Sequence, residues 1–203
     1  MTKPVLEVII GSTRPGRAGA PIARWFYDLA VADGRFEVEL VDLAVADGRF
    51  EVELVDLAEV NLPIFNEPNH PNQGKYEFEH TKRWSATVSR GDAFVFVVPE
   101  YNHSFNAATK NAIDYLHNEW RYKPAGIVSY GGAIMGTRSA QHLKPVFSAL
   151  KLVHAGDVSI PLVTTPVVDG VFVGNDILIN SAKSLLNELD FITPGLMQLR
   201  AGR

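Results

Sequence analysis

The sequence predicts an α/β fold, a doubly wound five-stranded parallel sheet with helices on both faces, and three observations lead to it. The chain alternates between short apolar runs and amphipathic stretches, which is the order of βαβ units in a parallel sheet. The apolar runs within 5–10, 92–100 and 125–130 are continuous, as expected for strands buried on both faces. With 203 residues and 46% hydrophobic side chains, the chain suits a single domain, 1–203.

Each element follows from its local pattern. The strand VLEVII (5–10) leads into a loop rich in glycine and arginine (11–19), and a helix begins near Pro21 with apolar residues at helical spacing. The alternating stretch FEVELV predicts an edge-type strand, and the stretch 57–74, rich in proline and asparagine, predicts a long loop. Further along, we expect helices at 76–90, 105–118, 134–150 and 176–190, strands at 92–100 and 125–130, and a weaker strand at 153–160.

Five strands connected in this way predict the order 2-1-3-4-5. The strand FEVELV then lies at one edge, where its outward glutamates discourage pairing with another sheet. In folds of this type, ligands bind beyond the carboxyl ends of the strands, where the strand order reverses. The loops that follow the strands at 5–10, 92–100 and 125–130 are therefore the expected location of a site.

One segment of the chain occurs twice. Residues 29–42, LAVADGRFEVELVD, are repeated without a change as residues 43–56. We interpret this copy as a recent in-frame duplication, as an engineered insertion, or as a device that changes assembly, because it is too short for a solenoid repeat. The predicted sheet has one position for FEVELV, and both copies fit it locally. The spare copy then forms a loop, an added antiparallel edge strand, an extension of the preceding helix by about 3.9 turns, or an element that pairs with another protomer.

The composition excludes several classes of site. The chain has no cysteine, which excludes disulfides, iron–sulfur clusters and thiolate nucleophiles. Its six histidines show no HxxxH or HxH pairing, so we expect no metal site. The net charge of −4, without a long basic run, disfavours nucleic acid as a partner. No stretch approaches the roughly 20 apolar residues of a membrane span, and the first residues do not resemble a signal peptide, so we expect a cytoplasmic protein.

The first candidate loop spans residues 11–19. Backbone N–H groups at a helix amino terminus bind phosphate, and Ser12 and Thr13 add hydroxyl donors. Arg14 and Arg17 add charged groups that match phosphate oxygens. The loop lacks both the Gly-Lys-Ser/Thr ending of a P-loop and the spacing GxGxxG. The pattern favours an anion site, and the alternative is an ordinary turn with solvated arginines.

The second and third candidate loops suit a flat ring. In PEYNHS (99–104), Asn102 offers hydrogen bonds to a ring edge and Tyr101 offers a flat wall; the alternative is a loop with a helix cap. In SYGG (129–132), the paired glycines permit close backbone approach; the alternative is a turn that needs a positive φ. One loop for phosphate and two for a ring, on one rim, together suit FMN.

Three motifs resemble those of the NAD(P)H-dependent FMN reductases, a flavodoxin-like group that includes quinone, azo-dye and chromate reductases. GSTRPGRAG resembles the GSxRxxR loop of that family, PEYNHS followed by KNAIDYL resembles PEYN-x-S…LKNAIDW, and SYGG resembles the third flavin loop. The resemblance covers nearly the whole chain apart from one copy of the repeat. The departures are Thr109, where the family has leucine, and the duplication itself.

The resemblance implies a role for each matched residue. The FMN phosphate is expected at Ser12, Thr13, Arg14, Arg17 and Gly19, and the isoalloxazine ring between Pro99, Glu100, Tyr101 and Asn102 on one side and Ser129, Tyr130, Gly131 and Gly132 on the other. No side chain is expected as a catalytic nucleophile, since the flavin carries the chemistry. His103 is the candidate for lining the acceptor pocket.

The activity implied by the resemblance is hydride transfer from NADPH or NADH to flavin N5, followed by transfer of two electrons to a quinone, an azo compound, free flavin or a similar acceptor. It also implies a homodimer or homotetramer. Two other functions are weighed: a flavodoxin-type electron carrier without NAD(P)H activity, which the loop arginines disfavour, and a non-catalytic assembly module driven by the duplicated strand. The acceptor, the choice between NADH and NADPH, and the oligomer size stay open.

Overall fold

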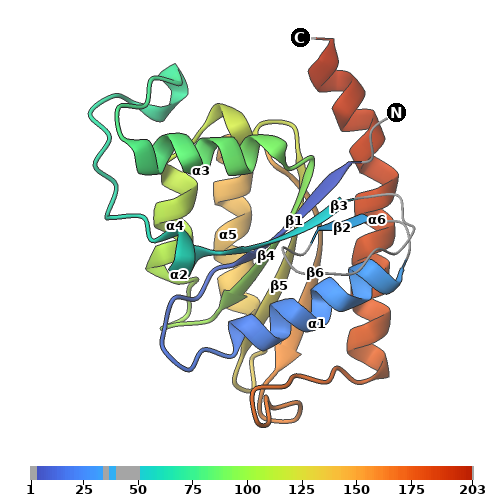
Figure 1. The fold of residues 1–203 in the computed structure, drawn as a ribbon. Helices are drawn as coiled ribbons and strands as arrows, with labels where there is room; N and C mark the ends of the chain where they lie inside the picture. The colour runs from blue at the N-terminus through green and yellow to red at the C-terminus, as the bar shows by residue number, and fades with distance from the viewer. Residues whose placement is uncertain (1–3, 34–36, 40–50, 203) are drawn as a thin grey trace.

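A computed structural model describes residues 4–33, 37–39 and 51–202. Its core is a parallel sheet in the order β2-β3-β1-β4-β5-β6 (Figure 1). The strands are β1 (Val5–Ile10), β2 (Glu37–Glu39), β3 (Glu51–Asp56), β4 (Ala93–Pro99), β5 (Pro124–Gly131) and β6 (Val153–Pro161). The run β3-β1-β4-β5-β6 is the predicted 2-1-3-4-5 order, which is thereby confirmed, and β2 is an addition to it.

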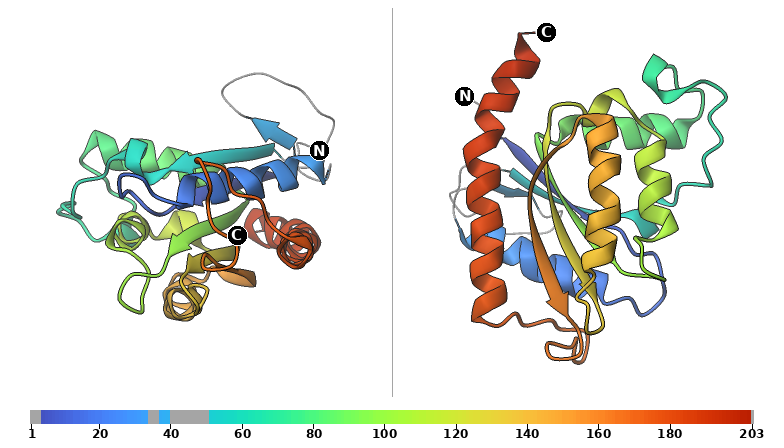
Figure 2. Two further views of the ribbon diagram at one scale, coloured as in Figure 1. Left: turned by 90° about the horizontal axis from the view of Figure 1, so that it is seen from below. Right: turned by 180° about the vertical axis from the view of Figure 1, so that it is seen from behind.

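Helices cover both faces of the sheet (Figure 2). They are α1 (Gly19–Ala32), α2 (Leu57–Val60), α3 (Glu79–Arg90), α4 (Ala107–Asp114), α5 (Thr137–Leu150) and α6 (Asp176–Ala201), with short 3₁₀ helices at Pro71–Gln73 and Asn118–Trp120. Helices α1 and α6 pack on one face, and α3, α4 and α5 pack on the other.

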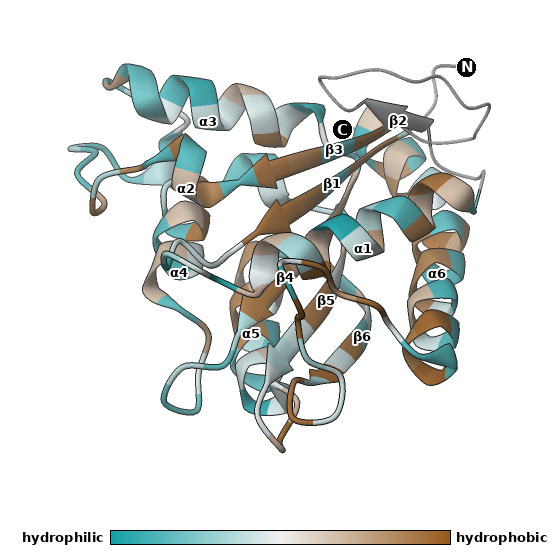
Figure 3. Ribbon diagram, turned by 60° about the horizontal axis from the view of Figure 1, so that its bottom comes forward, coloured by the Kyte–Doolittle hydropathy of each residue, from teal (hydrophilic) through white to brown (hydrophobic). Residues whose placement is uncertain are grey.

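The continuous apolar strands form the centre of two cores. On the α1 and α6 face, Phe26 and Leu186 pack against strand residues such as Val8 and Val128. On the opposite face, the aromatic side chains gather in one fully buried group: Trp84, Phe94, Phe96, Trp120 and Phe147. Burying large aromatic rings in edge-to-face and tilted contacts stabilises this face strongly. The hydropathy colouring shows the hydrophobic strands between the more polar helices (Figure 3).

The structure assigns the two copies of the repeat to two neighbouring strands. The second copy occupies the position next to β1, as β3, and the first copy adds the edge strand β2. An added strand was one of the predicted outcomes, but its direction was predicted wrongly, because β2 pairs parallel to β3. Helix α1 ends at Ala32, so the first copy does not lengthen it. The stretch 40–50 lies outside the described residues, and it contains the whole of 43–49, which would be the turn before an antiparallel edge strand.

The register between the copies is exact. Glu37 pairs with Glu51, Val38 with Val52, and Glu39 with Glu53, so each residue of β2 faces its own duplicate. The backbone ladder between β2 and β3 therefore joins the two copies at equivalent positions.

Several element boundaries differ from the prediction. Helix α4 ends at Asp114, four residues before the predicted end, and the next segment turns into the 3₁₀ helix Asn118–Trp120. Helix α6 continues to Ala201 through Pro194, although no clear pattern marked the tail. The predicted loop 57–74 contains α2 and a 3₁₀ helix. Local signals locate elements better than they locate their ends.

Two ionisable side chains that influence each other, Glu7 and Lys123, are buried toward the amino end of the sheet. Glu7 on β1 is 0% exposed, and neither carboxylate oxygen has a hydrogen-bond partner among the described residues. Burial raises the pKa of Glu7 to about 8, and the neighbouring Glu53 adds to the rise. Lys123 donates hydrogen bonds to the Val88 and Ser89 carbonyls at 2.8 and 3.3 Å, and burial lowers its pKa to about 8.

The described parts of the chain contain neither a membrane-spanning helix nor a cluster of metal-binding side chains. No helix there is both long and apolar enough to cross a membrane. In the same residues, no group of three or more histidine, aspartate or glutamate side chains is arranged to hold a metal ion.

Candidate functional site

Three loops meet at the carboxyl rim of the sheet: 11–18 after β1, 100–106 after β4, and 132–136 after β5. Because β1, β4 and β5 are adjacent and parallel, the ends of these strands lie side by side (Figure 3). The Ser12 hydroxyl lies 3.1 Å from the Tyr101 hydroxyl, which joins the first loop to the second. The Glu100 N–H donates to the Tyr130 carbonyl at 2.9 Å, which joins the second to the third. The structure therefore brings the three predicted loops together.

The backbone of the first loop leaves a helix terminus open. The Gly11 N–H donates to the Val97 carbonyl at 2.9 Å, and the Arg17 N–H donates to the Arg14 carbonyl at 3.1 Å. Ala18 is the N-cap residue of α1, and the helix therefore begins without a side-chain cap and without an acidic residue in its first turn. The partial positive charge of a helix amino terminus in this state attracts an anion.

Two buried donors beside this terminus have no hydrogen-bond partner among the described residues: the Arg17 Nε and the Tyr130 hydroxyl. The terminal guanidinium nitrogen of Arg17 pairs with Asp56, which also caps α2 by accepting from the Ala58 N–H at 2.9 Å. Buried donors without partners are rare in folded proteins. Two of them beside an uncapped helix fit a negatively charged ligand group. Of the other predicted residues here, Ser12 and Gly19 are buried, whereas Thr13 and Arg14 are exposed.

Helix α4 holds the first loop through two side chains that sequence reasoning did not identify. The Asn106 Nδ2 donates to the Gly11 carbonyl at 2.6 Å, and the Thr109 hydroxyl donates to the Asn106 Oδ1 at 2.8 Å. Asn106 occupies the N-cap position of α4, yet its side chain does not cap that helix. A Cβ on Gly11 would lie 2.3 Å from the Thr109 Oγ1, so the loop passes directly against it. The only signal in the sequence was the departure at position 109.

The second loop is a tight turn that exposes a ring. Tyr101 and Ser104 exchange backbone hydrogen bonds of 2.8 and 3.1 Å, and Asn102 and His103 adopt positive φ values of 49° and 69°. The side chain of Tyr101 stays 39% exposed, so one part of its ring is open to a ligand. Asn102 and His103 are exposed at the tip of the turn.

Pro99 and Glu100, which precede this turn, accept hydrogen bonds from the start of α5. The Glu100 carboxylate accepts from the Arg138 N–H at 3.2 Å and lies 3.7 Å from the Arg138 guanidinium, so it caps α5 from outside. The Pro99 carbonyl accepts from the Ser139 hydroxyl at 2.9 Å. Both predicted residues therefore lie at the rim. The Glu100 carboxylate and the Pro99 carbonyl stabilise the start of α5.

The third loop closes on itself. The buried Ser129 hydroxyl donates to the Met135 carbonyl at 3.1 Å, and the positive φ values of the turn belong to Met135 and Gly136. Gly131 and Gly132 do not have positive φ, so the alternative reading of SYGG as a positive-φ turn is wrong for these two residues. A Cβ on Gly132 would meet nothing within 4 Å, so open space lies beside its backbone.

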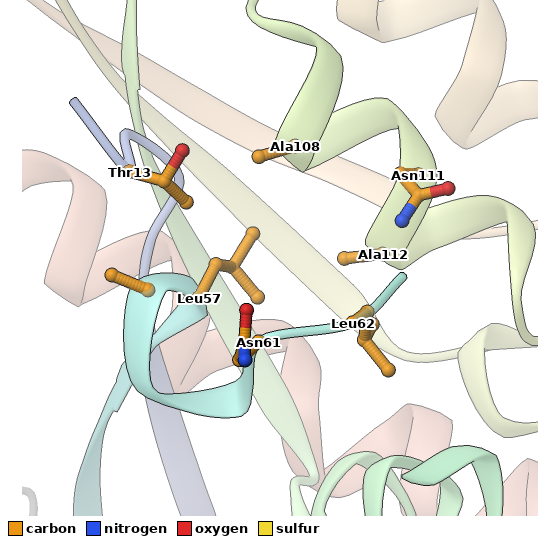
Figure 4. Close-up of a pocket in the computed structure, with 8 residues that line it drawn as sticks. Thr13, Leu57, Asn61, Leu62, Ala108, Asn111 and Ala112 are labelled. Atoms are coloured by element: carbon orange, nitrogen blue, oxygen red, sulfur yellow. The ribbon is translucent and has the colours of Figure 1, made fainter. Parts of the chain in front are cut away.

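A cleft of about 270 Å³ adjoins the first loop between α2 and α4 (Figure 4). Its lining combines small and apolar side chains with two amides: Thr13, Leu57, Ala58, Asn61, Leu62, Ala108, Asn111 and Ala112. Asn111 also holds the far wall in place, since its side chain donates to the Pro63 carbonyl at 2.7 Å and accepts from the Phe65 N–H at 2.8 Å. Sequence reasoning did not predict this cleft, because residues 57–65 had no recognisable motif.

Comparison with known proteins identifies the family. Residues 5–165 match the sequence profile of the NADPH-dependent FMN reductases. An NAD(P)H-dependent FMN reductase of Schizosaccharomyces pombe is 38% identical over 173 residues, which is 83% of this chain and 78% of that protein. An NAD(P)H-dependent FMN reductase of a Nectria species is 34% identical over 130 residues, which is 62% of this chain and 59% of that protein. The chain thus spans less than two thirds of the Nectria relative.

Solved structures confirm the fold. The flavoenzyme FerB, an NAD(P)H:acceptor oxidoreductase of Paracoccus denitrificans, superposes with a TM-score of 0.65 at 20% identity, covering 93% of this chain and 98% of its own. The flavodoxin of Megasphaera elsdenii superposes with a TM-score of 0.55 at 12% identity, covering 92% and 98%. Together with the profile match and the relative of Schizosaccharomyces pombe, they show that the chain belongs to the NADPH-dependent FMN reductase family and has a flavodoxin-like fold.

Proposed function

We propose that this chain is an FMN-dependent NAD(P)H oxidoreductase that reduces a small acceptor such as a quinone, an azo compound or free flavin. The observation that carries the proposal is the uncapped amino terminus of α1 beside the two unpaired buried donors of Arg17 and Tyr130. Relatives named NADPH:quinone oxidoreductase from Oryza sativa and quinone reductase from Pseudomonas putida support a quinone as the acceptor.

The first loop holds the phosphate in this proposal. The amides of α1 and the loop face the phosphate oxygens, and Ser12 and Thr13 add hydroxyl donors. The exposed Arg14 closes over the phosphate from solvent, while Arg17 is held in place by Asp56 and retains a free Nε. Gly19 lets the first turn of the helix lie directly against the Tyr130 hydroxyl.

The second and third loops border the ring. The Tyr101 ring forms a wall, and Asn102 and the backbone after Pro99 and Glu100 offer hydrogen bonds to the ring edge. Across the rim, the open space at Gly132 receives the other side of the ring system. Ser129, Tyr130 and Gly131 end β5 and carry this loop, and the Ser129 hydroxyl holds it through the Met135 carbonyl. His103, exposed at the tip of the turn, lines the acceptor side.

When bound, FMN supplies the redox chemistry, accepting a hydride from NAD(P)H and returning two electrons to the acceptor. The chain binds the cofactor, orients nicotinamide and acceptor in turn over the exposed ring face, and keeps the phosphate end anchored. No protein nucleophile is required. Assembly into a homodimer or homotetramer and placement in the cytoplasm stay predictions.

An anaerobic absorption spectrum tests the proposal. Purified protein is mixed with FMN, freed of excess cofactor, and titrated with NADPH and then NADH. We expect a bound-flavin spectrum that bleaches, and whose colour returns when a quinone is added. A bound flavin that neither nucleotide bleaches would indicate a flavodoxin-type carrier, which the structural likeness to flavodoxins makes the second candidate. A folded protein that binds no FMN would refute both and favour an assembly module.

A further inference from the structure

The side chain of Tyr130 points away from the expected flavin ring. Tyr130 belongs to β5, and its side chain packs in the core on the α1 side of the sheet rather than facing the rim. Its hydroxyl reaches the amino terminus of α1. A Cβ on Gly19, the first residue of that helix, would lie 2.6 Å from the Tyr130 hydroxyl. Tyr130 therefore connects the end of β5 to the start of the phosphate loop's helix, and its hydroxyl lies against Gly19.

The Tyr130 hydroxyl is buried and unpaired. The residue is 4% exposed, and the hydroxyl has no hydrogen-bond partner among the described residues. The nearby Ser12 hydroxyl already pairs with Tyr101 at 3.1 Å. Folded proteins rarely leave a buried donor unsatisfied unless a ligand or water completes it. The Arg17 Nε, on the same loop, is in the same state.

The charge state of the phenol suits a donor to an anion. Burial raises the pKa of Tyr130, and the nearby Ser12 hydroxyl and Arg17 guanidinium only partly oppose the rise. The hydroxyl therefore keeps its proton throughout the physiological pH range. A phenol that donates to a phosphate oxygen forms a short, charge-assisted hydrogen bond, stronger than one between neutral groups.

We propose that the Tyr130 hydroxyl donates a hydrogen bond to the terminal phosphate group of the flavin cofactor, so that Tyr130 selects FMN over riboflavin. This inference rests on the proposed function, and it moves Tyr130 from the ring, where the motif resemblance put it, to the phosphate. Riboflavin has the same ring and ribityl chain but no phosphate. A contact to the phosphate therefore affects the binding of FMN and leaves the binding of riboflavin unchanged.

The test uses Tyr130→Phe, which removes the hydroxyl and keeps the ring. Dissociation constants for FMN and riboflavin are measured by quenching of flavin fluorescence, and the thermal midpoint is measured without flavin. We expect the FMN constant to rise about 10-fold or more, the scale of a charge-assisted hydrogen bond. The riboflavin constant stays the same. The thermal midpoint without flavin stays equal or rises, because an unpaired buried hydroxyl is lost.

Tyr27→Phe is the matched control. Tyr27 lies on α1, is 2% exposed, and also carries a buried hydroxyl without a partner among the described residues, but it is two turns beyond the phosphate loop. We expect this variant to leave both flavin constants unchanged. The proposal fails if Tyr130→Phe leaves the FMN constant unchanged or weakens FMN and riboflavin equally. If the unmodified protein binds neither flavin, the proposed function fails, and this inference fails with it.

Discussion

The buried carboxyl of Glu7 makes a pH-dependent stability that a single substitution should remove. We consider Glu7→Gln, which keeps the size of the side chain and removes its ionisation. In the unfolded chain, this carboxyl has the ordinary glutamate pKa of about 4.5, whereas in the folded protein its pKa is about 8. Between these values the folded state binds one more proton than the unfolded state. The free energy of unfolding therefore falls as the pH rises through this window.

The size of the effect follows from the shift. One pKa unit corresponds to about 1.4 kcal/mol, so the complete shift sets an upper limit of about 5 kcal/mol. Local relaxation and water entry reduce such differences for buried charges, and we expect about 2–3 kcal/mol between pH 5 and 8. The difference in the free energy of unfolding between Glu7→Gln and the unmodified protein should grow steadily with pH in favour of the variant. Lys123 has a lowered pKa of about 8, and the Glu7 carboxylate raises that pKa, so Glu7→Gln also changes the titration of Lys123 at the upper end of this range. The interval from pH 5 to 7 therefore reports most directly on Glu7.

Urea unfolding of the flavin-free protein at pH 5, 6, 7 and 8 measures this difference. Glu188→Gln is the control, since Glu188 is exposed on α6 and its loss should not change the pH slope. Flavin binding should be the same in both variants, because Glu7 lies toward the amino end of β1 and the candidate site lies beyond its carboxyl end. Parallel stability curves for Glu7→Gln and the unmodified protein would refute the reasoning and show that Glu7 is ionised in the fold.

Three further predictions concern the candidate site and the repeat. Thr109→Val leaves the Asn106 Oδ1 buried without its donor. This should lower the free energy of unfolding by about 1–2 kcal/mol and weaken the binding of FMN more than that of riboflavin. Urea unfolding and flavin titration measure these effects, and Thr109→Ser is the control that should restore both. Arg14→Ala should weaken FMN binding by about 1.5–3 kcal/mol, and an unchanged dissociation constant would remove Arg14 from the phosphate site. Deletion of 43–56 should leave a five-stranded protein that unfolds cooperatively and binds FMN, as followed by circular dichroism and titration; loss of cooperative unfolding would show that the fold requires both copies.

The sequence predicted what depends on local pattern. The continuous apolar runs located β1, β4 and β5, and the loops that follow them meet at one rim because parallel strands end at one edge. Contacts between segments far apart in the chain were not predictable. Asp56 pairs with Arg17 across 39 positions, and Asn106 reaches Gly11 across 95. No local signal marks either contact, since both form only after the sheet has brought the segments together.

The direction of Tyr130 is an intermediate case. Alternation along β5 puts Tyr130 on the same face as Val128, and both belong to the core on the α1 side. The alternation of side chains along the strand therefore indicates which face of the sheet Tyr130 occupies, whereas the family motif alone does not. How far the ring extends beneath α1 depends on Gly19 and on the packing of the helix, which the sequence pattern leaves undetermined.

The repeat shows how identical sequences come to adopt different positions. Asp42 and Asp56 end identical segments and are both followed by Leu-Ala, so local preference cannot choose which copy lies beside β1. The segments that follow each copy decide which one lies beside β1. The strand beside β1 must continue into α2 and the segment 61–65, which Asn111 holds against α4. Only the second copy is joined to that segment directly, and it is also the copy whose aspartate caps α2 and pairs with Arg17. The first copy is left to pair at the open edge, in register with its duplicate and away from the rim. The candidate site therefore keeps its contacts although the chain carries an additional strand, which is why we expect the deletion to preserve FMN binding.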